Sequence, residues 1–402
     1  MKRAGLLRVL GTAFVFLAAT GVGAQERPFH TASTAHYRVL SDAGPTVALD
    51  VARKMEAALS LYNEYLRFDL SELPLPLRVR IFRAREDYDR HLQELISESR
   101  SDFVFISYND PARSELIGFQ REAESFDASL LHYGFIQFLN ARVRGVPPWL
   151  EEGMATYLEA AVYDAAANRF TFRPNFTWLD SFKAIITDPE LSPRFSLDEL
   201  LRQDRSAAEA SIEIFYPAAW ALVHFLLESP DRRFNRILWD ILSALDPQAG
   251  GPENAERARA RAFSWITPGE LQQALEGHML SLKSFNDLVR EGVEEYGRNA
   301  PEQARERFLQ AVQVRQDSFI PAYYLGLIAY QNKAYDEAAR HYREAQRLGI
   351  DPALIHYALG VNAFANRDYG LAVDYLSRAR ELGAEAYAEK VDALLKRIEV
   401  LR

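Results

Sequence analysis

The first 120 residues combine short apolar segments with longer segments of helical spacing. A helix is predicted over residues 46–68, where apolar side chains recur every three or four positions, and a charged helix over residues 86–98. Strands are predicted where apolar side chains alternate with polar ones or follow one another, at residues 36–40, 77–82, 103–108 and 116–119. This order of strands and helices is typical of a mixed α+β region.

Two further helices are predicted between residues 127 and 157. The first has apolar residues at helical spacing, with Asp127 as its N-cap and Gly145 placed to end it. After a short loop, Pro147 and Pro148 open the second helix. A later segment, residues 215–227, predicts another apolar helix, and its apolar stretch at residues 220–227 is far too short to cross a bilayer.

From about residue 285 the chain repeats itself with a spacing of 34 residues. Each predicted repeat is a pair of antiparallel helices, with small residues where the helices cross closely and a bulky residue that fills the space against the next repeat. The small residues in register are Gly292, Gly326 and Gly360, then Ala304, Ala338 and Ala372, then Ala311, Ala345 and Ala379. The bulky residues are Phe308, Tyr342 and Leu376. Residues 386–402 fit a polar capping helix.

This repeat resembles the tetratricopeptide repeat (TPR) family over residues 285–402. The resemblance implies an all-α solenoid of three repeats whose first helices form a concave, peptide-binding face. By the family's pattern that face carries Val293, Tyr296, Tyr323, Leu327, Tyr330, Tyr357, Val361 and Phe364. We therefore expect a protein or peptide partner. The alternative is that these side chains only pack between repeats.

The N-terminal two-thirds resemble the gluzincin metallopeptidases of the peptidase-MA-like group. The segment Pro-Trp-Leu-x-Glu-Gly-x-Ala-x-Tyr at residues 148–157 carries the resemblance, together with the apolar helix at residues 215–227. It covers roughly residues 35–280 and implies a thermolysin-like lobe of α+β fold whose second half is mostly helical. In that family a His-Glu-x-x-His motif on the first helix and a glutamate on the second hold a catalytic zinc ion.

Two of the four functional positions of that family are lost in this chain. The first histidine matches His132 and the downstream glutamate matches Glu152, but the general base falls on Tyr133 and the second histidine on Ile136. Tyrosine is not a carboxylate base and isoleucine cannot bind a metal. The motif reads His132-Tyr133-Gly134-Phe135-Ile136. We therefore expect no zinc or other cofactor and an inactive descendant that keeps the fold.

Two alternatives to a plain scaffold stay open. A residual metallopeptidase would need a further ligand near His132 and Glu152, and His224 could supply it only if its helix packs there. Alternatively, the former active-site cleft binds a peptide without cutting it. In the favoured interpretation His132 is a satisfied interior histidine, Glu152 pairs with it or with an arginine, and Tyr133 and Ile136 fill the space of the metal.

Three other side chains have structural interpretations. Trp149 and Trp220 are expected in the domain core. Glu151 and Glu152 point about 100° apart on their helix, so this pair is not expected to converge on one substrate.

Composition narrows the classes of partner. The chain has 402 residues, of which 48% are hydrophobic and 26% charged, as in folded globular proteins. It has no cysteine, which excludes disulfides, thiolate zinc sites and cysteine nucleophiles. Its formal net charge is -9 and no run of Lys or Arg follows the first residues, which argues against nucleic acid and anionic membranes as partners.

The start of the chain has the pattern of a signal peptide. Lys2 and Arg3 are followed by an apolar stretch to about residue 20 and by small residues up to Ala24. We predict cleavage after Ala24, with retention as an anchor as the alternative, and a periplasmic or extracellular protein. The predicted parts are a signal peptide (1–24), a degenerate gluzincin domain (25–282) and a TPR domain (283–402). Together they predict an exported protein-binding scaffold or adaptor.

Overall fold

The computed structural model describes residues 28–401 except 74–75, 99 and 173–174. The predicted signal peptide lies outside the described residues. None of the described helices is long and apolar enough to span a bilayer.

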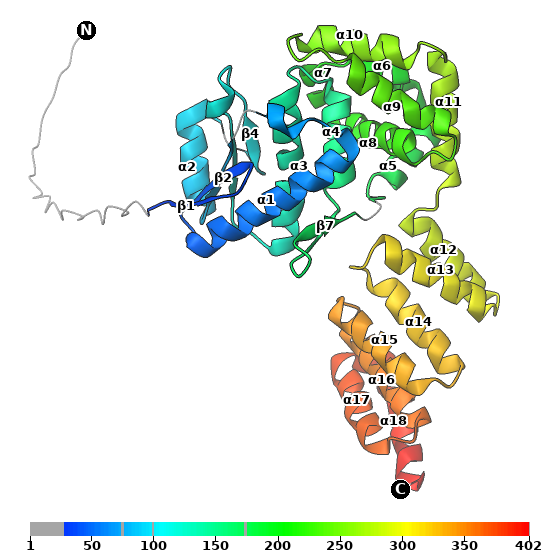
Figure 1. Ribbon diagram of the computed structural model, residues 1–402. Coiled ribbons are helices and arrows are strands. Elements are labelled where there is room, and N and C mark those ends of the chain that lie inside the picture. Colours follow the sequence, from blue (N-terminus) through cyan, green and yellow to red (C-terminus); the bar gives the residue numbers. More distant parts are fainter. Residues whose placement is uncertain (1–27, 74–75, 99, 173–174, 402) are drawn as a thin grey trace, which may run out of the picture.

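The N-terminal region is built around a five-stranded mixed sheet (Figure 1). The strands are β1 (His30–Ser33), β2 (Tyr37–Ser41), β3 (Leu77–Phe82), β4 (Val104–Ile106) and β5 (Glu115–Phe119). Their order in the sheet is β1-β2-β3-β5-β4. The three central strands are parallel, with Val79 opposite both Val39 and Leu116, and both edge strands pair antiparallel. All four predicted strands are present, within two residues at each end.

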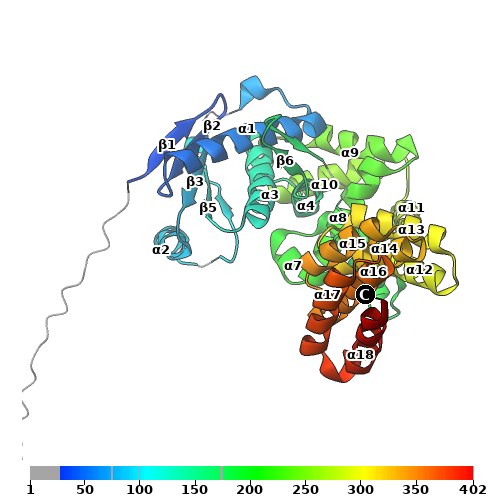
Figure 2. The ribbon, with the colours of Figure 1, turned by 90° about the horizontal axis from the view of Figure 1, so that it is seen from below.

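Helices cover both faces of this sheet, as Figure 2 shows. The helices α1 (Pro45–Leu66) and α3 (Ala123–Arg142) pack on one face, and α2 (Arg85–Ile96) packs on the other. Successive strand residues point to opposite faces, so Val79 and Leu116 join the core under α1 and α3, while Phe82 and Ile117 join the smaller core under α2.

The predicted start of α3 is wrong. The helix begins at Ala123, and Asp127 lies in its second turn instead of at its N-cap. The carboxylate of Asp127 accepts a hydrogen bond of 2.7 Å from Lys54 Nζ on α1, so it serves a tertiary ion pair. The helix ends at Arg142, and Gly145 lies in the loop beyond with φ of 65°. A Cβ at Gly145 would lie 2.5 Å from the backbone nitrogen of Gly251, so this close approach requires glycine.

The second half of this region is mostly helical, apart from the hairpin of β6 (Val162–Asp164) and β7 (Arg169–Thr171). Its helices are α4 (Pro148–Leu158), α5 (Leu179–Thr187), α6 (Leu197–Arg202), α7 (Arg205–Glu209), α8 (Ile212–Glu228), α9 (Arg232–Ala244), α10 (Gly251–Ala262) and α11 (Pro268–Ser281). Short 3₁₀ turns occur at η1 (Leu70–Glu72), η2 (Pro111–Arg113) and η3 (Ser192–Arg194).

The helices α4 and α8 form the centre of this half. A Cβ at Gly153 would lie 2.5 Å from the carbonyl oxygen of Ala219, so the absence of a side chain allows the two backbones to approach. Trp149 and Trp220 are completely buried, which confirms their predicted place in the core.

The C-terminal part is a TPR-like stack of helix pairs with a last, single helix (Figure 1). Its helices are α12 (Phe285–Gly297), α13 (Pro301–Val314), α14 (Phe319–Gln331), α15 (Tyr335–Arg347), α16 (Pro352–Ala365), α17 (Tyr369–Leu382) and α18 (Ala384–Leu401). Val391 and Ile398 of α18 are buried against the last pair, as expected of a capping helix.

The 34-residue register is explained by contacts inside each repeat. A Cβ at Gly326 would lie 2.5 Å from the ring of Tyr342, and Gly292 and Gly360 meet Phe308 and Leu376 in the same way. The bulky residues were expected to fill space against the next repeat. They first cover the glycine of their own repeat, and Phe308 also stacks on Tyr324 of the next one at 4.9 Å between ring centroids.

Polar contacts connect the first repeat to α5. Lys183 donates hydrogen bonds to the carbonyl oxygen of Leu282 at 2.6 Å and to the carboxylate of Asp287 at 2.7 Å. Asp287 also completes a capping box with Ser284 at the start of α12. One carboxylate therefore serves both the start of a helix and its attachment to α5.

Candidate functional site

The helices α3 and α4 bring His132 and Glu152 together. His132 Nε2 lies 3.2 Å from Glu152 Oε2, and His132 Nδ1 lies 2.8 Å from Glu159 Oε2, just after α4. Only 13% of the His132 side chain is exposed. His132 is thus an interior histidine with both ring nitrogens hydrogen-bonded, and Glu152 makes the histidine contact that the sequence predicts.

Arg205, from the short helix α7, extends this contact into a chain of ionic groups. Its Nη1 lies 3.2 Å from Glu152 Oε1, and its other terminal nitrogen contacts Glu151 Oε2. Glu151 Oε1 in turn accepts a hydrogen bond of 2.5 Å from Asn140 Nδ2 on α3. Glu151 and Glu152 leave the helix in different directions, yet one guanidinium group is wide enough to bridge both carboxylates, a contact that the sequence analysis did not predict.

The ionic groups around His132 shift one another's pKa values. Burial alone would lower the pKa of His132, but hydrogen bonds to Glu152 and Glu159, and their charges, raise it to about 10. Burial would raise the pKa of Glu152, and its contacts with His132 and Arg205 lower it. For Glu151 burial prevails over the charge of Arg205, so its pKa is raised. His132 is therefore a cation at neutral pH.

The two positions that depart from the metallopeptidase motif are occupied by apolar and aromatic groups. Ile136 is 8% exposed within the core, and the half-buried ring of Tyr133 lies 4.9 Å from the imidazole of His132. Burial raises the pKa of Tyr133 above the usual value of a tyrosine.

These residues do not fit a catalytic zinc ion. Ile136 supplies no ligand, Tyr133 supplies no carboxylate base, and the guanidinium of Arg205 contacts the carboxylate that would face the metal. Across residues 28–401, outside the short gaps, no group of three or more His, Asp or Glu side chains is placed to hold a metal ion.

His224 lies in a separate cluster. Its ring is buried on α8 beside Tyr157, Trp220 and His278, with 5.7 Å between the centroids of the two imidazoles. Burial, with the charge of His278, lowers the pKa of His224 to about 4. It is not among the groups that contact His132.

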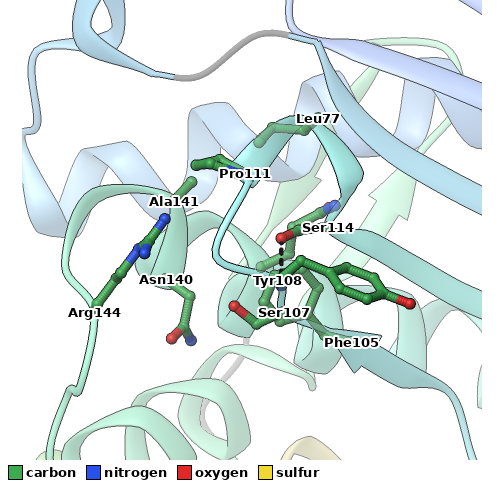
Figure 3. Close-up of a pocket in the computed structure, with 10 residues that line it drawn as sticks. Leu77, Phe105, Ser107, Tyr108, Pro111, Ser114, Asn140, Ala141 and Arg144 are labelled. Carbon is green, nitrogen blue, oxygen red and sulfur yellow. Dashed lines mark hydrogen bonds between the residues drawn. The ribbon is translucent and has the colours of Figure 1, made fainter. Parts of the chain in front are cut away.

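Two small pockets adjoin the ionic chain. One lies beside Arg205 and Tyr216, and 57% of the Arg205 side chain is exposed there. Figure 3 shows the other, with Ser107, Tyr108, Asn140 and Arg144 around a common space between the end of β4 and α3. Its lining includes the buried Gln137, whose Oε1 has no hydrogen-bond partner among the described residues.

The residues predicted for the repeat face lie on the first helices of the three pairs. We call them the first-helix face: Val293, Tyr296, Tyr323, Leu327, Tyr330, Tyr357, Val361 and Phe364. Val293 is exposed and the other seven are partly buried.

The aromatic members of the first-helix face also contact other rings of the repeats. Tyr323 contacts Tyr324 and Tyr342, and Tyr357 contacts Tyr387 at 5.0 Å between ring centroids. Tyr296 also contacts Tyr324 of the next repeat, at 5.4 Å between ring centroids. The members of this face therefore pack within and between repeats and are also partly exposed to solvent.

Sequence reasoning missed three members of the ionic chain. Glu159 follows Glu152 by two helical turns and could have been found from that spacing. Asn140 follows Ile136 by one turn on α3, a weak signal. Arg205 lies beyond a hairpin and two helices, and no local pattern indicates it.

Comparisons with known proteins give one partial family match and one weakly similar structure. The family "Protein of unknown function (DUF1570)" matches residues 132–246, under a third of the chain, and this segment contains His132, Asn140, Glu151, Glu152, Glu159 and Arg205. No curated protein matches. The crystal structure of the APC/C hetero-tetramer Cut9-Hcn1 is similar at 18% identity and a TM-score of 0.28, covering 79% of this chain and 54% of the other. This chain thus spans about half the length of that one, and a TM-score so low carries no argument about the fold.

Proposed function

We propose that this chain is an exported protein-binding scaffold, with TPR-like repeats that bind a partner and a degenerate gluzincin domain that does not cleave peptides. The observation that carries the proposal is that the first-helix face keeps apolar and aromatic side chains partly exposed in all three repeats. Apolar and aromatic side chains that recur at equivalent, partly exposed positions along a stack are suited to contact with another chain.

The spacing of this face favours a peptide or helix as the bound element. Val293, Leu327 and Val361 are equivalent positions, and Tyr296, Tyr330 and Phe364 are another equivalent set. A segment that runs along the stack would meet the same two kinds of side chain at regular intervals, as an amphipathic helix or extended strand requires. The eight members carry no formal charge, so we propose an apolar partner segment.

A peptide-display selection on the full mature chain tests this proposal. We expect apolar peptides to be enriched and to lose binding at least about tenfold with Leu327→Ser. The matched control is Leu309→Ser, an equally apolar leucine that is 37% exposed on the second helix of the first repeat. Peptides that lose binding equally with both variants, or with neither, would contradict a site on the first-helix face.

The loss of peptidase activity is a separate proposal with its own support. Arg205, His132 and the two adjacent glutamates form a closed set of ion pairs where the family has a metal and its water. The test is the zinc content of the purified mature protein after dialysis against zinc, with His132→Ala as control. Near-stoichiometric zinc that is lost in the variant, together with cleavage of a casein or peptide substrate, would overturn the proposal.

A second candidate function is peptide binding without cleavage in the pocket of Figure 3. Two observations favour it: the unpartnered Gln137 Oε1, and the position of β4 at the edge of the sheet, where no described strand pairs with its outer side. Peptides bound there should survive Leu327→Ser and be lost with Ser107→Trp, which fills the pocket. The opposite pattern assigns them to the repeats.

A further inference from the structure

A larger pocket lies apart from the ionic chain and from the repeats. It accommodates about 360 Å³, within the usual range for small-molecule sites. Figure 1 places α9 and α11 beyond α4 and α8 as seen from the sheet. The pocket is lined by Arg233, Arg236 and Asp240 of α9, Arg261 of α10, and Ser264 and Trp265 after α10.

The pocket is positively charged in a chain of net charge -9. Three guanidinium groups line it against a single carboxylate. Asp240 is shared by Arg236 at 3.5 Å and Arg261 at 3.4 Å. Arg233 is held by Asp231 at 2.7 Å.

Two of these guanidinium groups keep donors free for a ligand. The side chains of Arg236 and Arg261 are 76% and 47% exposed, and each makes one long contact, with the same carboxylate. A guanidinium has five N–H donors in a planar fork that matches a carboxylate or phosphate. An entering anion would therefore find paired donors that do not first have to leave a strong partner.

Trp265 adds a flat apolar surface to this pocket. Of the five tryptophans, all within the described ranges, it alone is exposed, at 44%. Phe234 supports it with 6.2 Å between ring centroids and 34° between planes. An exposed indole that another ring supports is suited to stacking, since its electron-rich face attracts the positively polarised C–H bonds of a ligand ring.

We propose that this pocket binds an acidic saccharide. Trp265 stacks on the apolar face of one sugar ring, and Arg236 and Arg261 bind the carboxylate of that ring or its neighbour. Asp240 and Ser264 are placed at the same pocket to hydrogen-bond sugar hydroxyls. A flat apolar face, hydroxyls and one negative charge together match five of the six lining residues, and the sixth, Arg233, is held by Asp231. The surrounding negative charge of the protein disfavours anions elsewhere on its surface.

The test is a titration of the full mature chain with a glucuronate-containing oligosaccharide, by saturation-transfer NMR and calorimetry. A neutral glucose oligosaccharide of equal length and adenosine monophosphate serve as the other two probes. We expect the acidic saccharide to bind with Kd below about 1 mM, more weakly as salt is raised, and more tightly than either other probe.

Variants then locate the binding. Arg236→Ala and Trp265→Ala should each weaken it about tenfold or more, and Trp265→Phe should retain most of it. Arg232→Ala is the matched control, since Arg232 is exposed on the same helix but does not line the pocket. No binding of the acidic saccharide, equal binding of the neutral one, tighter binding of the nucleotide, or equal loss with the control overturns the proposal.

Discussion

Arg205→Ala removes the cation that holds two buried carboxylates, and its effect can be worked out from the contacts. Glu151 and Glu152 are 3% and 6% exposed, and after the substitution Glu151 keeps only its hydrogen bond from Asn140. Breaking a fully buried ion pair costs about 3–5 kcal/mol. Because 57% of the Arg205 side chain is exposed to solvent, we expect about 2 kcal/mol at pH 7.

The pH dependence of this loss has a definite sign. Burial already raises the pKa of Glu151, and removal of Arg205 raises it further. A carboxyl group whose pKa is higher in the folded state binds protons on folding, so its contribution to stability grows as pH falls through that pKa toward the unfolded value. The difference between Arg205→Ala and wild type should therefore be smaller at pH 5 than at pH 7.

Urea unfolding followed by tryptophan fluorescence measures this difference. All five tryptophans lie between residues 149 and 265, so the signal reports the N-terminal region and not the repeats. In the double variant Arg205→Ala with Glu151→Gln, the buried charge is gone and part of the stability should return. A loss below about 0.5 kcal/mol at pH 7, or one that grows toward pH 5, would refute the assigned coupling.

Three further predictions concern other parts of the molecule. Burial lowers the pKa of His224 to about 4 from the usual 6.5, so protonation of the unfolded chain should reduce the free energy of unfolding by up to about 3 kcal/mol as pH falls from 6.5 toward 4. The free energy of unfolding, followed by fluorescence, should depend less on pH in His224→Phe. Gly326→Ala should cost about 1–3 kcal/mol in thermal melts followed by circular dichroism, because its Cβ would collide with the ring of Tyr342. Gly297→Ala should be neutral or stabilising, because a Cβ there meets nothing within 4 Å beyond its own helix backbone and chain neighbours. Thr267→Ala, which removes the capping box of α11, should cost about 1 kcal/mol in urea unfolding, and an unchanged midpoint would contradict the cap.

Local signals explain which parts of the fold could be predicted. The strand over residues 77–82 is apolar enough to be recognised alone, and the 34-residue register is visible because each glycine must meet one bulky partner of its own repeat. The capping box at Thr267 likewise depends on four consecutive residues and is a local signal.

The failures have a common cause, which is long-range pairing. Asp127 has the chemistry of an N-cap, but Lys54 on another helix takes its carboxylate. The divergence of Glu151 and Glu152 on their helix is correct geometry for α4 alone. It ceased to matter once Arg205, more than fifty residues away, bridged both. Sequence spacing fixes the directions of side chains on one element and says nothing about which distant side chain arrives between them.

The carboxylate of Asp287 links the start of the repeats to the N-terminal region. It accepts from the backbone of Ser284 at the start of α12 and from Lys183 on α5, so ordering the first turn of α12 and attaching it to α5 favour each other. Thermodynamic reciprocity then applies. A partner that immobilises the first repeat tightens its attachment to α5, and any event that releases Lys183 loosens the end of the repeats at which a bound segment would start. If the proposed partner binds the repeats, the junction would therefore influence binding without touching the partner.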